Sequence, residues 1–173
     1  MKHHVEFEQW VPVGIDRVFL FFANPNNLPR IMPPETGTQL IRLKLVPPAS
    51  ATIRSGDVED RHRLAGAGSE IVTSFRVLPF LRLRAEWVAA ITEFEWNHHF
   101  VDTQTRGPLK SFRHRHELSS QTRNNADGTS IRDVIDYEVG FSLLGDLAQK
   151  LFIGPHLRRT FAYRQKALQV LLG

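Results

Sequence analysis

The feature that most constrains the fold of this chain is its last stretch, 143–173, LLGDLAQKLFIGPHLRRTFAYRQKALQVLLG. Mostly apolar side chains recur there at spacings of mostly three and four, the period of one helix face. Gly154 and Pro155 interrupt the pattern, because proline lacks a backbone donor and crowds the preceding turn. We therefore predict one long helix with a kink near 153–156, or two collinear helices. The predicted inner face holds Leu144, Leu147, Ala148, Leu151, Phe152, Leu157, Phe161, Ala162, Gln165, Leu168 and Leu172, and the predicted water-facing side holds Arg158, Arg159, Arg164 and Lys166.

The rest of the chain is predicted to form the sheet that this helix covers. Two short helices, joined at Asn24-Pro25, follow the first strand, and the later strands are separated by short turns, which is typical of an antiparallel meander. A helix of roughly 25–28 residues is about 40 Å long, enough to span such a sheet. The predicted strands are 3–12, 37–46, 69–78, 83–93, 95–104, 109–122 and 129–141.

These elements predict an α+β fold, a seven-stranded curved antiparallel sheet wrapped around a long C-terminal helix. A strongly twisted sheet bent around one helix cannot touch it everywhere, so the architecture encloses a cavity. We expect a single domain over 1–173. Its longest loop, 47–66, is a mobile lid, a disordered insertion, or a misassigned strand around 51–53.

Composition narrows the classes of function. The chain has no cysteine, which excludes disulfides and thiolate metal sites. Its first ten residues carry charges where a signal peptide needs an apolar run, and no stretch predicts a membrane span. We therefore expect a cytoplasmic protein. The net charge of +4 comes from scattered arginines, so we predict no nucleic-acid partner. The sequence does not determine an oligomeric state.

The central hairpin carries the candidate chemistry. In strand 95–104, aromatic side chains alternate in phase with His98, and in strand 109–122 they alternate in phase with His114 and His116. Burying each large apolar side chain is worth about 1.5–3 kcal/mol, so the aromatic members predict which face looks inward. The three histidines then point inward with them. Asp133 is the one charge on the apolar face of the last strand, and it needs a partner, for which an inward histidine is the nearest candidate.

Two interpretations of His98, His114, His116 and Asp133 remain open. In the first, they line the cavity, where they orient a polar group of an otherwise apolar ligand or act as general acid and base. In the second, they form a hydrogen-bonded polar network that fixes the register of the sheet. A metal held by the three histidines has suitable ligand types, but alternating histidines on a strand are common without metal. We therefore predict no metal and no cofactor. The predicted ligand-binding set is Trp87, Phe94, Trp96, His98, Phe100, Phe112, His114, His116, Asp133, Tyr137 and Phe161.

Three phrases, in this order, resemble the SRPBCC superfamily of START-like and birch-pollen-allergen-like helix-grip domains. They are QWVPVGIDRVFLFFANPNNLPRIMPP, similar to the strand–helix–helix start of these domains, AGAGSEIVTSF, similar to the entry to their third strand, and ITEFEWNHHFVDTQTRGPLKSFRHRHEL, similar to their central hairpin in a branch of ligand-binding members. The resemblance implies a deep, mostly apolar pocket, used by relatives for lipids, sterols, polyketides, plant hormones or aromatic metabolites. Pocket residues differ between branches, so none is transferred by position.

The favoured function is binding of a hydrophobic small molecule by a carrier or sensor, because no nucleophile or cofactor motif accompanies the predicted cavity. The second candidate is a polyketide cyclase-like enzyme, a dehydratase or an isomerase, in which His98, His114 or His116 exchanges protons with Asp133. The third is a protein-partner module, which requires an exposed apolar patch that the mixed outer faces of the strands do not provide.

Overall fold

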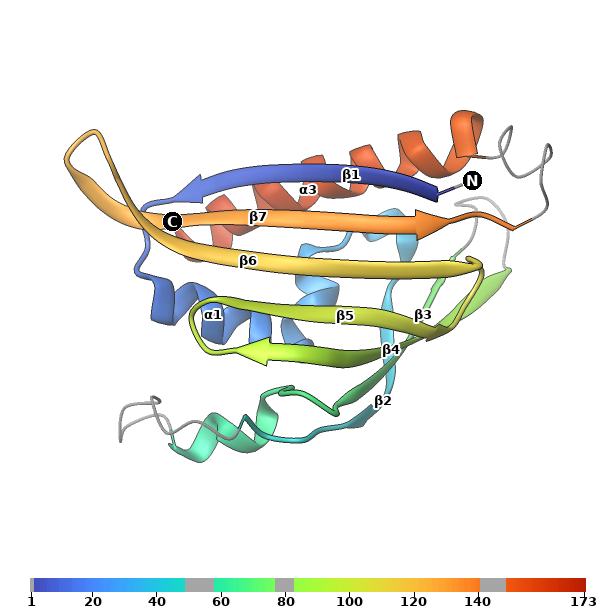
Figure 1. Cartoon of the computed structure of the whole chain (residues 1–173), viewed down its shortest axis with the longest axis horizontal. Coiled ribbons are helices and arrows are strands. Elements are labelled where there is room, and N and C mark those ends of the chain that lie inside the picture. Colours follow the sequence, from blue (N-terminus) through green and yellow to red (C-terminus); the bar gives the residue numbers. More distant parts are fainter. Residues whose placement is uncertain (1, 49–57, 77–82, 141–148) are drawn as a thin grey trace.

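The sheet predicted from the sequence is present in the computed structural model, which describes residues 2–48, 58–76, 83–140 and 149–173 (Figure 1). Seven strands form one antiparallel sheet in the order β1-β7-β6-β5-β4-β3-β2. The first strand therefore pairs with the last, and the sheet curves around the helices that lie behind it in Figure 1. The strands are β1 (Lys2–Val11), β2 (Gln39–Lys44), β3 (Glu70–Arg76), β4 (Arg84–Glu95), β5 (His99–Arg106), β6 (Ser111–Arg123) and β7 (Ala126–Glu138).

The helices also follow the predicted order. The two short helices after β1 are α1 (Ile15–Ala23) and the 3-10 helix η1 (Pro25–Ile31), and a further 3-10 turn, η2 (Pro34–Thr36), leads to β2. At the C-terminus a π-helical turn, η4 (Gln149–Ile153), precedes α3 (Gly154–Leu172). Pro155 lies in the first turn of α3, where its missing N–H costs no hydrogen bond. The helix changes from π to α geometry at Gly154, where an interruption was predicted, and the predicted helical residues before Gln149 lie outside the described part.

Helix α3 lies along β1, on the inner side of the sheet (Figure 1). Gln9 Nε2 donates to the Gln165 carbonyl at 2.7 Å, and Gln165 Nε2 donates to the Glu8 carbonyl at 3.0 Å. The Phe7 ring stacks on the Phe161 ring with 4.3 Å between centroids. These contacts fix which turn of α3 faces the strands. Among the described residues, no helix is both long and apolar enough to cross a membrane.

The turn between β4 and β5 differs from the prediction. Strand β4 continues to Glu95, and Trp96, Asn97 and His98 form the turn, with Asn97 at a φ of 60°. Asn97 Nδ2 donates to Asp16 Oδ1 of α1 at 2.6 Å, which anchors this turn. The prediction that His98 points inward is therefore wrong. His98 is exposed, because it lies in a turn, where strand alternation does not apply.

A β-bulge reverses the expected direction of a second residue. Ile91 pairs with Asp102 and Glu93 pairs with Val101, so Thr92 is an extra residue in β4. Strict alternation along β4 would set Glu93 on the inner face with Trp87 and Ile91. The bulge turns it instead to the outer face, where it accepts hydrogen bonds from Arg113 and Arg115.

The C-terminal part of the predicted long loop packs into the core. Residues 58–63 form the 3-10 helix η3 (Val58–Arg63), and Leu64 and Ala65 are buried beyond it. The Ala65 N–H donates to the Ala23 carbonyl at 2.8 Å, which ties this segment to the end of α1. The remainder of the predicted lid or strand, 49–57, lies outside the described residues, as do the ends of the predicted strands 69–78 and 129–141 beyond residues 76 and 140.

Candidate functional site

Two carboxylates and two imidazoles form a buried polar cluster on the inner face of the sheet. Asp102 of β5 lies opposite His114 of β6, and His116 of β6 lies opposite Asp133 of β7, so strand register alone brings the four together. Asp133 Oδ1 lies 2.8 Å from His114 Nε2 and 2.8 Å from His116 Nδ1. Asp102 Oδ2 lies 3.2 Å from His116 Nε2 and 3.5 Å from His114 Nδ1. Each imidazole is therefore held between both carboxylates.

Burial and mutual contact set the protonation of this cluster. Desolvation acts to raise the pKa of Asp133, but the hydrogen bond to His114 and the contact with His116 outweigh it and hold that pKa well below its ordinary value. For Asp102, desolvation is likewise outweighed by His116, and the pKa is lowered. Desolvation and the charge of His116 lower the pKa of His114. Desolvation also acts on His116, but its two carboxylate partners raise its pKa. At neutral pH, both carboxylates are thus ionised and His114 is neutral.

Two members of this site were not predicted. Asp102 has a signal in the sequence, because it lies two residues beyond Phe100 and therefore on the same face of β5. Arg164 was predicted to remain in water, and that prediction is wrong. Its side chain is buried, with the guanidinium 4.8 Å from the centroid of the Phe161 ring and near enough to Asp102 to help lower the pKa of that carboxyl. Arg164 lies between Phe161 and Leu168 in the helical repeat, so the same spacing that predicted the helix also places it inward.

Aromatic rings run from this cluster along the inner face, and we call Phe75, Trp87, Phe112, Phe161 and Phe7 the inner aromatic row. Trp87 lies 6.3 Å from Phe75 and 4.8 Å from Phe112, measured between centroids. His114 lies 6.1 Å from Phe112 and 5.5 Å from Phe161, so it joins the two halves of the row. Phe75, Trp87 and Phe112 are only half-buried, which leaves part of this apolar surface uncovered.

The other predicted aromatic residues belong to a different neighbourhood. Phe94, Trp96 and Phe100 surround Phe19 of α1, with ring centroids 5.0–6.0 Å from it. They are part of the core under α1. Phe100 also stacks on His116 at 4.2 Å and so connects this core to the polar cluster. The predicted set therefore divides, and the structure brings together Trp87, Phe112, His114, His116, Asp133, Tyr137 and Phe161.

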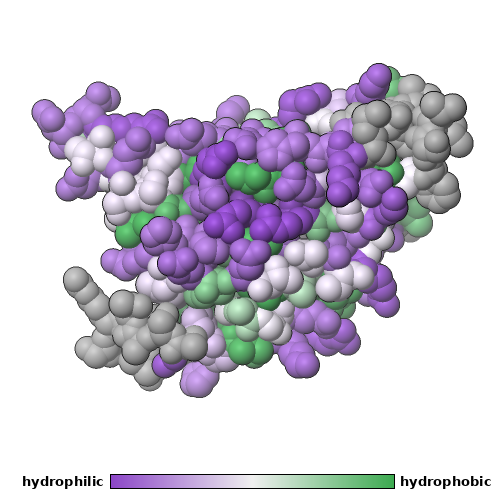
Figure 2. Space-filling view, in the orientation of Figure 1, coloured by the Kyte–Doolittle hydropathy of each residue, from purple (hydrophilic) through white to green (hydrophobic). Residues whose placement is uncertain are grey.

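The outer face of the sheet carries a different chemistry. Figure 2 views this face, and hydrophilic side chains cover much of it over β1, β7 and β6. Glu117 accepts from Arg115 at 2.8 Å and from Arg132 at 2.9 Å, and Arg132 also donates to Glu6 at 2.8 Å. An open groove of about 420 Å³ on this side is lined by charged and polar side chains that include Glu8 and Arg115. This surface does not provide the apolar patch that a partner module of the predicted kind requires.

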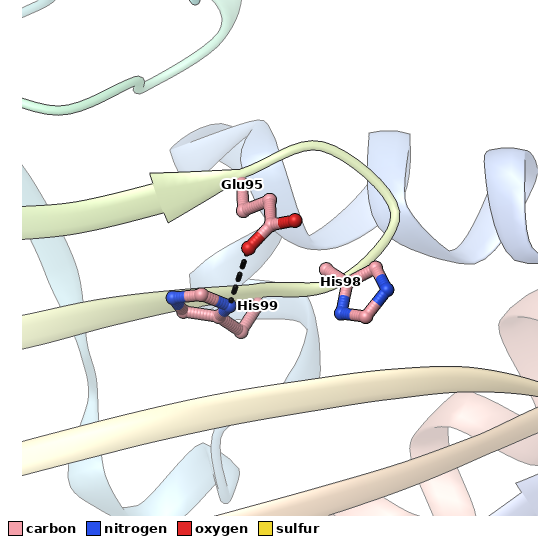
Figure 3. Close-up of side chains that lie close together, drawn as sticks. All are labelled: Glu95, His98 and His99. Atoms are coloured by element: carbon pink, nitrogen blue, oxygen red, sulfur yellow. Dashed lines mark ion pairs between the residues drawn. The ribbon is translucent and has the colours of Figure 1, made fainter.

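A second, exposed group of polar side chains lies at the β4–β5 turn. Glu95 Oε2 lies 3.5 Å from His99 Nδ1. Figure 3 shows the Glu95 carboxylate turned toward the His99 ring, whereas the His98 ring stands apart beside the turn. His98, which the sequence placed in the site, therefore belongs to this surface group.

The fold, a curved antiparallel sheet gripping a C-terminal helix, is the helix-grip fold of START-like and birch-pollen-allergen-like proteins. The chain is similar in structure to a START superfamily protein from Mycobacterium smegmatis, with a TM-score of 0.61 and 13% identity over 98% of this chain and 97% of that one. It is also similar to major latex-like protein 151 from Panax ginseng, with a TM-score of 0.63 and 10% identity over 99% and 98%.

A third similar structure is a protein from Thermus thermophilus, TTHA0849, with a TM-score of 0.61 and 14% identity over 96% of this chain and 94% of that one. No family model matches the sequence, and no curated protein matches it. Identities this low show a shared fold, and the fold is compatible with binding of a small molecule.

Proposed function

We propose that this protein binds a hydrophobic small molecule, of the lipid, polyketide or aromatic-metabolite class, between the sheet and α3, and acts as a cytoplasmic carrier or sensor. The enclosed cavity is part of this proposal. The apolar part of the molecule would lie against the inner aromatic row, and its polar group would face the polar cluster. Trp87, Phe112, Tyr137 and Phe161 provide apolar contacts, and His114, His116 and Asp133 provide polar ones.

The observation that carries this proposal is an incompletely covered apolar surface that ends at a buried polar cluster. Phe75, Trp87 and Phe112 remain half-buried although they point to the inner side of the sheet. Sites for small molecules combine predominantly aromatic and apolar walls with a few converging polar groups. The inner aromatic row and the four clustered His and Asp side chains have this composition.

An enzyme that uses the same groups is the second candidate. It is favoured by the 2.8 Å contact between His114 Nε2 and Asp133 Oδ1, the arrangement in which a carboxylate orients a base. The two candidates differ in what His114→Ala does to a bound compound. In a carrier the variant binds the compound more weakly, whereas in a cyclase, dehydratase or isomerase it abolishes turnover.

The test begins with native mass spectrometry of the protein purified from its own host. We expect a mass above that of the polypeptide, lost on denaturation, that identifies a co-purified apolar compound. The compound is then titrated into the emptied protein. Trp87→Ala and Phe112→Ala should each weaken binding by about ten-fold or more, because each removes a large contact surface worth about 1.5–3 kcal/mol.

Val170→Ala is the matched control, because Val170 of α3 is 83% exposed. Its affinity should equal that of the unmodified protein. A protein that carries no compound from its host and also fails to bind a lipid-like fluorescent probe, 1-anilinonaphthalene-8-sulfonate, would contradict the proposal. Equal losses of affinity in Val170→Ala and Trp87→Ala would place the binding surface elsewhere.

A further inference from the structure

Two groups of side chains in the described part of the chain offer three donor atoms to a metal ion, with all donors of a group within 4.8 Å of one another. One is the exposed group Glu95, His98 and His99 at the β4–β5 turn (Figure 3). The other is Asp102, His114 and His116, inside the polar cluster. The two differ in how firmly their donors are held.

We propose that Asp102, His114 and His116 bind one divalent transition-metal ion of the Zn²⁺ type, and that Asp133 orients the two imidazoles. This goes beyond the proposed function, because metal binding at these three residues does not depend on the apolar ligand.

The spacing of Asp102 Oδ2 from the two imidazole nitrogens fits a metal ion. A tetrahedral site with bonds of about 2.0–2.1 Å separates neighbouring donor atoms by roughly 3.3–3.4 Å. Asp102 Oδ2 lies 3.2 Å from His116 Nε2 and 3.5 Å from His114 Nδ1, on either side of that separation. The 3.5 Å contact is not a hydrogen bond of good geometry, so hydrogen bonding between Asp102 and His114 does not explain it.

The nitrogens on the far sides of the two rings support the same assignment. Histidines that bind metal almost always donate their other ring N–H to a carboxylate or carbonyl, which fixes the ring and its tautomer. Here Asp133 Oδ1 lies 2.8 Å from His114 Nε2 and from His116 Nδ1, the nitrogens turned away from Asp102. One carboxylate oxygen thus lies beside the outer nitrogens of both rings, hydrogen-bonded to that of His114, and the inner nitrogens face Asp102.

The contact between Asp133 and the second imidazole is close, but it is not a well-aligned hydrogen bond. His116 is buried, and its Nδ1 has no hydrogen-bond partner in the described structure, since its short contact with Asp133 is misaligned. A metal bound to Nε2 would place the ring proton on Nδ1, and a small rotation of the ring would then aim that proton at Asp133. The orphaned atom becomes a satisfied donor when the site is filled.

The local charge leaves room for a cation. When both imidazoles are neutral, as metal binding requires, Asp102 and Asp133 carry −2 and the buried Arg164 carries +1, so the site has a net charge of −1, which a divalent ion changes to +1. Asp102 is the least buried donor, with 19% of its side chain exposed, so the open fourth position lies on its side of the site. The remaining positive charge favours an anionic fourth ligand there, such as hydroxide or a carboxylate.

The exposed group at the β4–β5 turn lacks the burial and the shared carboxylate of the polar cluster. Glu95 and His98 are exposed, and His99 is shared between Glu95 and Glu93, with its Nε2 3.6 Å from Glu93 Oε2. No carboxylate in the described structure holds both of its imidazoles from behind. The exposed group therefore provides the matched control for the buried site.

The test uses the full chain. The protein is unfolded in guanidinium chloride with a chelator, refolded with Zn²⁺, passed through gel filtration and analysed for bound zinc. We expect about one zinc ion per chain, retained in the double variant His98→Ala/His99→Ala and lost in Asp102→Asn. Asp133→Asn should still bind one zinc ion, with affinity lowered about 10–100-fold, because it acts through the imidazoles.

Refolding with Co²⁺ gives a readout that needs no variant. We expect visible ligand-field absorption and two hyperfine-shifted imidazole N–H proton resonances, one from each histidine. Refolded wild-type protein that retains no zinc and shows neither Co²⁺ signal would overturn the proposal. It would also be overturned if the double variant lost the metal while a folded Asp102→Asn, checked by near-ultraviolet circular dichroism, retained it.

Discussion

For the residues of the buried polar cluster, the sequence indicated the orientation of single side chains but not all of the residues that they contact. Asp133 needed a partner on the adjoining strand, and it has two, His114 and His116. Asp102 entered the cluster because strand register sets it opposite His114. His98 was predicted to belong to the cluster but lies outside it, because the chain turns at that residue. Three histidines were considered as metal ligands in the sequence, and in the metal site that we propose Asp102 takes the place of His98.

The charge of Asp133 should stabilise the folded protein in a pH-dependent way. Asp133→Asn is expected to lower the free energy of unfolding by about 3 kcal/mol at pH 7 in chelator-treated protein, because it removes one partner of a buried ionic cluster. The pKa of Asp133 in the folded state lies below its ordinary value of 3.8. Its contribution is therefore full above that value and is lost as the pH falls through the lowered folded-state pKa.

Urea denaturation of both proteins between about pH 7 and pH 3 measures this effect. The difference between wild type and Asp133→Asn should grow as the pH falls from 7, because Asp133 raises the pKa of His116, and should narrow in the most acidic samples, where Asp133 itself gains a proton. A difference that stayed constant across the whole range would show that the carboxylate does not ionise differently in the folded and unfolded states.

At the scale of elements, the strands and helices were predicted well, and their ends were not. The turn between β6 and β7 is a tight two-residue turn, in which Asn124 and Asn125 both have positive φ, 51° and 60°. Asparagine tolerates that conformation, and the twist of such a turn matches the twist of the strands. The β4–β5 turn and the β4 bulge are less visible in the sequence, because a residue inserted into a strand leaves no pattern of its own.

Helix α3 should depend for its docking on Phe161 far more than on its exposed aromatic neighbour. Phe161 is buried, stacks on Phe7 at 4.3 Å and contacts His114, so Phe161→Ala should lower the free energy of unfolding by about 3–5 kcal/mol. Phe152, in the preceding turn, was predicted on the inner face, and that prediction is wrong, because its side chain is 63% exposed. Phe152→Ala should therefore change the free energy of unfolding by less than about 0.5 kcal/mol. Urea denaturation monitored by circular dichroism compares the two, and equal effects would contradict this packing of α3.

At the scale of the whole molecule, the sheet pairs the first strand of the chain with the last. Strand β1 pairs along its length with β7, and α3 packs on β1, so the N-terminal strand is held by the last strand and the last helix. That 1–173 forms a single domain stays a prediction, and the continuity of the sheet is the reason to test it, since no strand can leave the sheet without exposing its neighbours.

Thermal unfolding should therefore be one cooperative transition. In differential scanning calorimetry of ligand-free and metal-free protein, the calorimetric enthalpy should equal the van't Hoff enthalpy, a ratio of about 1. Two resolved transitions, or a calorimetric enthalpy well above the van't Hoff value, would show that part of the chain unfolds independently.

The sequence by itself determined the element order, because periods of two and of three to four follow from backbone geometry and the burial of apolar side chains. It also placed His114, His116, Asp133 and the aromatic residues of the inner face. Only the tertiary structure decided which polar groups meet. A turn or a bulge of one residue reverses which face a side chain takes, and this is why His98 and Glu93 point outward. Asp102 and Arg164 join the site because register and helix docking bring separate elements together, and no local pattern records that contact.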